Sequence, residues 1–205
     1  MPYRYAFVAI ALFAYLACKA QAEEPLHQET FKSPDGKSQL EAKFWLKEGA
    51  PAARIDIELK QGSDIVFKTT IPEEKECRYV KASWSPTSQT ALVMLNFKSS
   101  EDWIVLQTRA DIVEASFFNG EKLVGTKLLD ALPFNDSIKN IAPNGRVAAN
   151  SIKWDGDESC SMSFLYRGIG YEGTANLLIN LRTKRPTLTV TSIVPQTDAA
   201  LWKAD

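Results

Sequence analysis

The sequence predicts an all-β fold built from antiparallel sheets, and three of its features support that prediction. Glycine and proline mark turns at intervals of roughly ten residues, as in all-β domains with many short strands. The segments between these turns alternate apolar and polar side chains, and several are rich in β-branched residues. Because alternate side chains of a strand point to opposite faces, this pattern is typical of antiparallel sheets with one solvated face.

Alternation is clearest in four segments, each of which we expect to form a strand with one buried face: residues 39–47, 53–60, 159–166 and 187–194. In the first of these, Leu40 and Phe44 fall on one face, while Glu41 and Lys43 fall on the other. The period of two excludes an amphipathic helix, whose apolar residues recur every three or four positions.

The segment Ala91–Phe97 differs, because it is apolar on both faces except at Asn96. We therefore expect a central strand that is covered on both sides. Residues 102–108 and 111–118 are expected to continue it as a meander. Two segments do not alternate as strands: residues 125–138 form a short helix or an irregular loop, and residues 197–203 form a terminal helical turn.

The N-terminus has the organisation of a secretory signal peptide. Arg4 supplies a positive charge, and the apolar run over residues 5–17 is too short to span a bilayer. Ala20-Gln21-Ala22 provides a small-x-small cleavage site. We therefore predict a signal peptide over residues 1–22 and a single all-β domain over residues 23–205, exported to the periplasm or the extracellular medium.

Leu16-Ala17-Cys18 offers an alternative, because it looks like the end of a bacterial lipobox. Tyr15 stands where that motif usually has leucine. The corresponding hypothesis is an outer-membrane lipoprotein with a lipid anchor at Cys18. No later run is apolar enough to predict a transmembrane segment.

Charge restricts the class of partner. Cleavage after Ala22 removes Arg4 and Lys19 from the 24 basic residues and none of the 25 acidic ones, which leaves 22 minus 25, or −3. Binding to nucleic acid or to an anionic membrane surface requires a basic patch, which the sequence lacks. We therefore expect no nucleic-acid partner.

Two cysteines, Cys77 and Cys160, remain after cleavage. In an oxidising compartment, such a pair predicts one disulfide; the alternative is two buried free thiols. Two thiols with no histidine nearby fall short of zinc coordination, so we predict no metal site and no cofactor.

Related turns recur along the chain, each followed by a candidate strand. They are Phe31-Lys-Ser-Pro-Asp-Gly-Lys37, Trp84-Ser-Pro-Thr-Ser-Gln89, Ala142-Pro-Asn-Gly-Arg146 and, without the proline, Lys153-Trp-Asp-Gly-Asp-Glu-Ser159. They resemble TolB-type and WD40-like β-propeller repeats, whose blades often begin with Trp-Ser-Pro-Asp-Gly and a strand. The resemblance implies small stacked sheets. We expect a sandwich or an open propeller-like stack of meander sheets, with a small closed β-propeller as the alternative.

Catalytic motifs are missing from the sequence. The mature chain has one histidine, His27 near its N-terminus, and no HExxH, GxSxG or P-loop pattern. This argues against serine–histidine and cysteine–histidine nucleophiles. We predict an exported, non-catalytic binding protein whose ligand is a protein or a carbohydrate. The alternatives are an extracellular hydrolase with two carboxylates and a lipid-anchored structural protein of the envelope.

The candidate binding segment is Tyr166-Arg-Gly-Ile-Gly-Tyr-Glu-Gly173. Tyrosine, arginine and glycine together are typical of adaptable recognition loops. We assign the binding role to four residues of this segment: Tyr166, Arg167, Tyr171 and Glu172. The alternative is an ordinary hairpin connection between strands over residues 159–166 and 174–181.

Three further features are weaker candidates. Trp45 and Trp103 adjoin charged residues and are potential stacking platforms, or else they pack under neighbouring elements. Asp155-Gly-Asp-Glu158 has oxygen ligands suited to calcium but lacks the spaced carboxylates of a complete binding loop, so an acidic turn is expected there.

Overall fold

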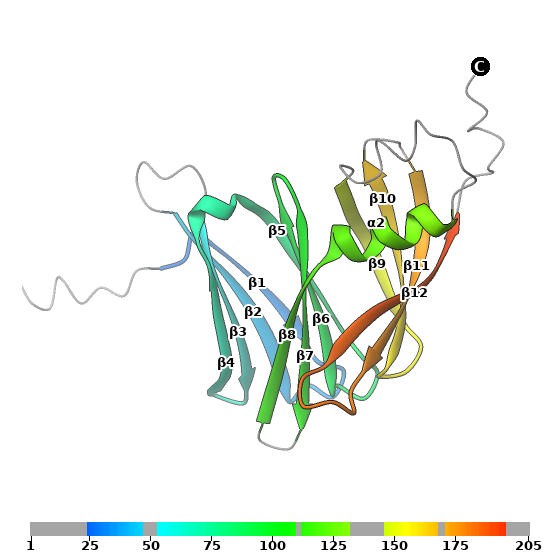
Figure 1. Cartoon of the computed structure of the whole chain (residues 1–205). Helices are drawn as coiled ribbons and strands as arrows, with labels where there is room; N and C mark the ends of the chain where they lie inside the picture. The colour runs from blue at the N-terminus through cyan, green and yellow to red at the C-terminus, as the bar shows by residue number, and fades with distance from the viewer. Residues whose placement is uncertain (1–23, 47–52, 110–111, 132–145, 168–170, 196–205) are drawn as a thin grey trace, which may run out of the picture.

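The protein folds into three antiparallel sheets of four strands each (Figure 1). The computed structural model describes residues 24–46, 53–109, 112–131, 146–167 and 171–195. Sheet 1 contains β1 (His27–Lys32), β2 (Ser38–Trp45), β3 (Arg54–Gln61) and β4 (Asp64–Ile71). Sheet 2 contains β5 (Cys77–Trp84), β6 (Thr90–Phe97), β7 (Glu101–Arg109) and β8 (Ile112–Asn119). Sheet 3 contains β9 (Arg146–Trp154), β10 (Ser159–Arg167), β11 (Tyr171–Asn180) and β12 (Thr187–Pro195).

Each sheet is a meander in which strands consecutive in the sequence are neighbours. The predicted all-β fold is therefore confirmed. The signal peptide, Cys18, the turn over residues 142–145 and the helical turn over residues 197–203 lie outside the described residues.

Sheet 2 is the middle of the stack. One apolar core lies between sheets 1 and 2 and includes Leu40, Ile57 and Val93. A second core, which includes Leu92 and Phe164, lies between sheets 2 and 3. All eight residues of β6 are buried, which confirms the predicted central strand with cover on both faces.

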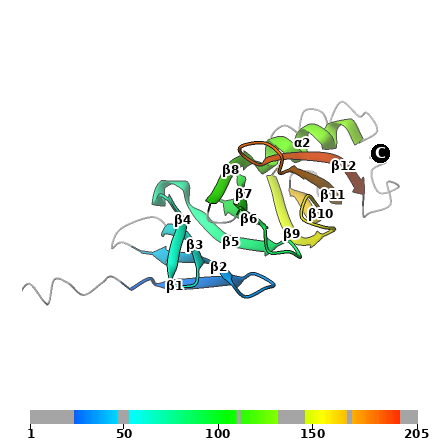
Figure 2. The same ribbon diagram turned by 90° about the horizontal axis from the view of Figure 1, so that it is seen from below.

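The three sheets stand in an open row, with sheets 1 and 3 at its two ends (Figure 2). The structure therefore agrees with an open stack and not with the small closed ring that was the alternative. The first strands of successive sheets adjoin, as the contact between β1 and β5 shows.

The first hairpins of sheets 1 and 2 have the same turn. In Ser33–Ser38 the N–H of the first residue donates to the carbonyl oxygen of the last (2.9 Å), and in Ser85–Thr90 the same bond measures 2.8 Å. In both turns the hydroxyl of the first serine accepts a hydrogen bond from the backbone N–H of the last residue, at 3.0 Å in the first turn and 3.1 Å in the second. The fourth residue has a positive φ in both, 71° at Gly36 and 65° at Ser88. The first two of the related turns in the sequence therefore share one geometry.

Two tryptophans connect successive sheets in the same way. Trp84 ends the first strand of sheet 2, and its Nε1 donates to the carbonyl oxygen of Phe31 in β1 (3.0 Å). Trp154 ends the first strand of sheet 3, and its Nε1 donates to Oγ of Ser83 in β5 (2.9 Å). Both bonds therefore join the first strands of neighbouring sheets.

The helix α2 (Gly120–Ala131) follows β8 directly and packs mainly on β12. It begins earlier than the predicted 125–138 segment, because Asn119 caps it: its Oδ1 accepts a hydrogen bond from the N–H of Lys122 (2.7 Å). At Gly120, an added Cβ would lie 2.5 Å from Cε2 of Trp103. The junction between β8 and α2 therefore requires glycine.

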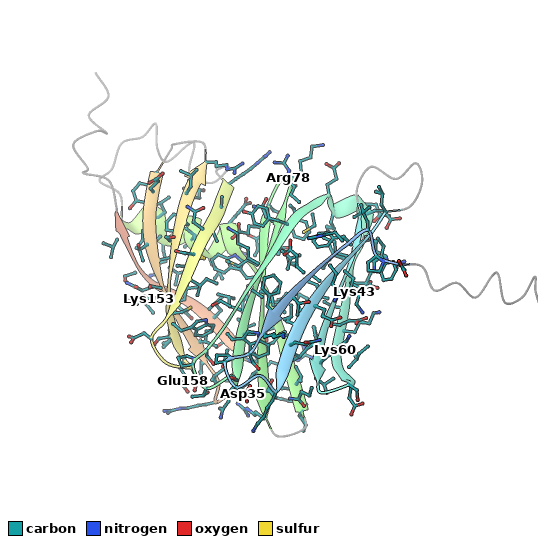
Figure 3. All side chains as sticks on the ribbon, turned by 180° about the vertical axis from the view of Figure 1, so that it is seen from behind. Asp35, Lys43, Lys60, Arg78, Lys153 and Glu158 are labelled. Atoms are coloured by element: carbon teal, nitrogen blue, oxygen red, sulfur yellow. The ribbon has the colours of Figure 1, made fainter. Side chains whose placement is uncertain are left out.

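The two outer faces of the stack are polar. On sheet 1, Lys43 pairs with Glu58 and lies 3.5 Å from Glu41, while Lys60 lies 2.9 Å from Glu41 (Figure 3 labels Lys43 and Lys60 on this sheet). On the outer face of sheet 3, Ser151 and Ser163 share a hydrogen bond of 2.7 Å. The exposed side chains of Leu178 and Val194 lie on the same face of sheet 3, among these hydroxyl groups.

Candidate functional site

The predicted binding segment does not present its tyrosines to solvent. Tyr166 and Tyr171 are 1% and 2% exposed, and the ring of Tyr171 packs against Phe164 with 6.1 Å between ring centroids. Their aromatic rings are part of the core between sheets 2 and 3. Arg167 and Glu172 are exposed, and the residues between them lie outside the described part of the chain. Alternation within β10 and β11 turns both rings inward and leaves only Arg167 and Glu172 exposed among the four residues given a binding role.

The predicted disulfide is also wrong in this structure. Cys77 and Cys160 are free and buried, and they belong to different cores, on opposite sides of sheet 2. Burial raises the pKa of both thiols to about 12. Both side chains therefore act as small apolar core residues.

Neighbouring side chains cover the two candidate tryptophans. Trp103 is fully buried, and its Nε1 donates to Oε1 of Glu101 (2.8 Å). Trp45 is partly covered by the guanidinium of Arg54, whose carbon lies 5.4 Å from the ring centroid. Each ring packs under a neighbour, which was the alternative considered for these residues.

Glu101 is the most enclosed acid of the described residues. Besides Trp103, its carboxylate accepts hydrogen bonds from the side chain of Asn96 (3.3 Å) and the backbone N–H of Ala149 in β9 (3.1 Å). Burial raises the pKa of Glu101, and these bonds oppose that effect. A carboxylate with no exposed surface and three donors joins sheets 2 and 3 but cannot reach a substrate.

The acidic turn joins two sheets. Oδ2 of Asp157 accepts a hydrogen bond from the hydroxyl of Thr87 (2.6 Å), and the neighbouring Ser88 hydroxyl accepts from the N–H of Asp35 in sheet 1 (3.1 Å). Figure 3 shows Asp35 and Glu158 at the same end of the molecule. Within the described residues, no three acidic, histidine or cysteine side chains are grouped to hold a metal ion.

An accessible apolar surface lies around β8, where Ile112 is 62% and Phe117 58% exposed. Two grooves flank this strand. The first groove, of about 490 Å³, lies between β8 and β4; its lining includes Ile71, Pro72, Lys75, Phe97, Asp102 and Phe117. The second groove, of about 420 Å³, lies between β8, α2 and β12; its lining includes Phe117, Phe118, Lys122, Leu123, Lys127 and Val190. We call this surface the β8 rim.

The two phenylalanines point to opposite sides of sheet 2. Phe117 is opposite Ile104, which belongs to the core with sheet 1, while Phe118 is opposite Trp103, which belongs to the core with sheet 3. Directly opposed residues of an antiparallel pair share a face. Phe117 therefore stands on the side of sheet 1 and Phe118 on the side of sheet 3, and both contribute to the lining of each groove.

The sequence predicted a strand over residues 111–118 but not a site there. Consecutive phenylalanines in a strand usually indicate cover on both faces. Sheet 1 contacts β8 through β4 but leaves Phe117 58% exposed, while Phe118 is half-buried against the core between sheets 2 and 3. The exposure of Phe117 depends on how the sheets are stacked. The one available signal was Phe117-Phe118 beside the lysines at positions 122 and 127.

Comparison of the sequence with protein-family models and with curated proteins finds no match. No helix in the described part of the chain is long and apolar enough to span a bilayer.

Proposed function

We propose that this protein is an exported, non-catalytic binding protein whose partner is a polypeptide held at the β8 rim. The observation that carries the proposal is Phe117, more than half exposed between two apolar grooves. Exposed aromatic side chains beside apolar pockets are typical of the anchor points of protein interfaces. A carbohydrate would require more hydrogen-bonding groups than these grooves provide, so the lining favours a polypeptide.

Export rests on the N-terminal sequence. We expect the mature chain isolated from the secreting cell to start at Glu23, which intact mass measurement would establish. An acylated Cys18 at the N-terminus would instead support the lipoprotein alternative. A full-length chain that begins at Met1 would contradict export through a cleaved signal peptide.

Binding at the β8 rim can be tested by selecting from a displayed library of random peptides against the mature chain. We expect enriched peptides whose binding is lost in Phe117→Ser and kept in Ile65→Ser. Ile65 is a matched control, because it is 51% exposed on β4 and lines neither groove. No enrichment, or peptides that bind both variants equally, would contradict the proposal.

A further inference from the structure

The backbone of β8 has one free edge. Its eight residues pair with β7 in continuous register from Asp102↔Asn119 to Arg109↔Ile112. No described strand pairs with its other edge. An unpaired edge offers a row of N–H and C=O groups to an additional strand.

The other edge strands have features that hinder such pairing. Irregular pairing with a bulge occurs at the edges formed by β4, β5, β9 and β12. The remaining edge, β1, carries Glu29 and Lys32, and its His27 lies 3.3 Å from Glu29. By contrast, β8 has regular register, no proline and a single charged residue, Glu114. Since bulges, charges and proline protect natural edges, β8 is the edge most open to a partner strand.

The two grooves lie where a strand beside β8 would direct its side chains. Successive side chains of such a strand point alternately to the side of Phe117 and to the side of Phe118. They would therefore enter the first and the second groove in turn. Strand addition of this kind combines main-chain hydrogen bonds with pockets for alternate side chains.

Charge indicates which residue types fit at the two ends of the β8 edge. The second groove is lined by Lys122 and Lys127, and by no acidic residue among those described. Glu114 lies on the same side of β8 as Phe118, nearer the start of the strand. A complementary partner thus needs a carboxylate beside Lys122 and a cation beside Glu114.

We infer that the partner of the β8 rim is an extended polypeptide segment that adds to sheet 2 as a fifth strand, antiparallel to β8. This inference rests on the proposed function. The segment has β-branched or other apolar side chains at its centre, an acidic residue at its N-terminal end and a basic residue at its C-terminal end.

The probe is the peptide acetyl-Glu-Thr-Val-Ile-Thr-Val-Lys-amide. When the peptide is laid antiparallel to β8 from Gly120 to Glu114, its first valine lies beside Phe118 and its isoleucine beside Phe117. Its glutamate then lies near Lys122 and its lysine beside Glu114. The matched control exchanges the terminal glutamate and lysine. We expect the mature chain to bind the probe more tightly than the control, and Phe117→Ser to weaken binding of the probe while Ile65→Ser does not.

N-methylation of the probe at single residues tests strand addition itself. In an antiparallel pair, alternate residues of the added strand direct their N–H groups to the neighbour. We expect methylation at one alternate set to weaken binding by about tenfold per position, and methylation at the other set to leave it unchanged. Equal effects at all positions, or none, would overturn the inference.

The remaining outcomes separate the two proposals. If the mature chain binds display-selected peptides but not the probe, the inference fails and the proposed function stands. If the chain instead forms dimers that Phe117→Ser disrupts, the occupant of the edge is a second copy and the inference fails. If the chain binds vesicles of anionic lipid through Phe117 and binds no peptide, both proposals fail.

Discussion

At the scale of single residues, Glu121 occupies surroundings that favour its neutral form. Burial, with the nearby carboxylates of Glu101 and Asp102, raises its pKa from 4.5 to about 6, while Arg146 opposes the shift. A carboxyl whose pKa is higher in the folded than in the unfolded state stabilises the fold when protonated. This contribution is fully present below pH 4.5 and is lost as the pH rises through about 6.

Glu121→Gln should therefore be more stable than the wild type at pH 7, and this advantage should disappear at pH 4. The glutamine keeps an acceptor for the backbone N–H of Val147 but carries no charge. Urea unfolding of both proteins at the two pH values measures the difference. An advantage that does not change with pH would contradict the assigned pKa.

Tyr171 and its neighbour Glu172 form a natural pair for testing burial. Tyr171→Ala removes a ring that is 2% exposed in the core, so we expect a loss of about 3 kcal/mol in unfolding free energy. Glu172→Ala changes an exposed side chain and should alter stability by less than about 0.5 kcal/mol. Similar values for the two variants would show that Tyr171 lies at the surface.

At the scale of elements, the carboxylate of Glu101 holds β7 against β9. Glu101→Ala would leave the Trp103 indole N–H and the Ala149 backbone N–H without their acceptor inside the core. We expect a loss of about 3 kcal/mol, since buried donors without partners are costly. Glu101→Gln retains one acceptor oxygen and should lose less. A loss of under about 0.5 kcal/mol for Glu101→Ala, as at an ordinary surface position, would contradict this role.

Strands with a complete buried face were predictable from sequence, and most edge strands were not. β2, β3, β6, β7 and β10 coincide within a few residues with predicted segments. The four strands without a predicted range, β1, β4, β5 and β9, are all edges. Edge strands are only partly covered, so their side chains need not alternate strictly between apolar and polar.

The composition and alternation of single segments did not predict the β8 rim, for a related reason. The segment from Tyr166 to Gly173 has the composition of a recognition loop, yet its rings complete a core shared by two sheets. The exposure of Phe117 depends on where neighbouring sheets end, which short-range pattern does not encode. Both outcomes follow from stacking of sheets and not from properties of a single strand.

At the scale of the whole molecule, charged side chains cover the outer face of sheet 1, which is one end of the stack. Burial raises the pKa values of Glu41 and Glu58, but hydrogen bonds and charges from Lys43, Lys60 and Lys68 outweigh it and lower both below 4.5. Carboxylates with lowered pKa values stabilise the fold above pH 4.5, and this contribution is lost as the pH falls through the folded-state values.

Lys43→Met should therefore destabilise the protein at pH 7, by about 2 kcal/mol, because Glu58 keeps only its pairing with Lys68. At pH 3 a larger share of both carboxylates is protonated than at pH 7, so the cost should be smaller. Chemical unfolding of the variant and the wild type at both pH values measures this difference. An equal cost at both would contradict an electrostatic role for this face.

The arrangement of the whole molecule favours the β8 rim as the proposed binding surface. Ion pairs lie on the outer face of sheet 1 and hydroxyl groups on the outer face of sheet 3, while sheet 2 packs against an apolar core on each side. The unprotected edge of β8, with its exposed Phe117, is the place where the described part of the molecule offers both free backbone and apolar grooves.

Amide hydrogen exchange of the mature chain, with and without the probe peptide at saturating concentration, tests this account most directly. We predict that exchange slows in residues 112–119 and in the groove-lining part of α2, while the outer faces of sheets 1 and 3 are unchanged. Slower exchange on either outer face, with β8 unaffected, would contradict the assignment of the binding surface to the β8 rim.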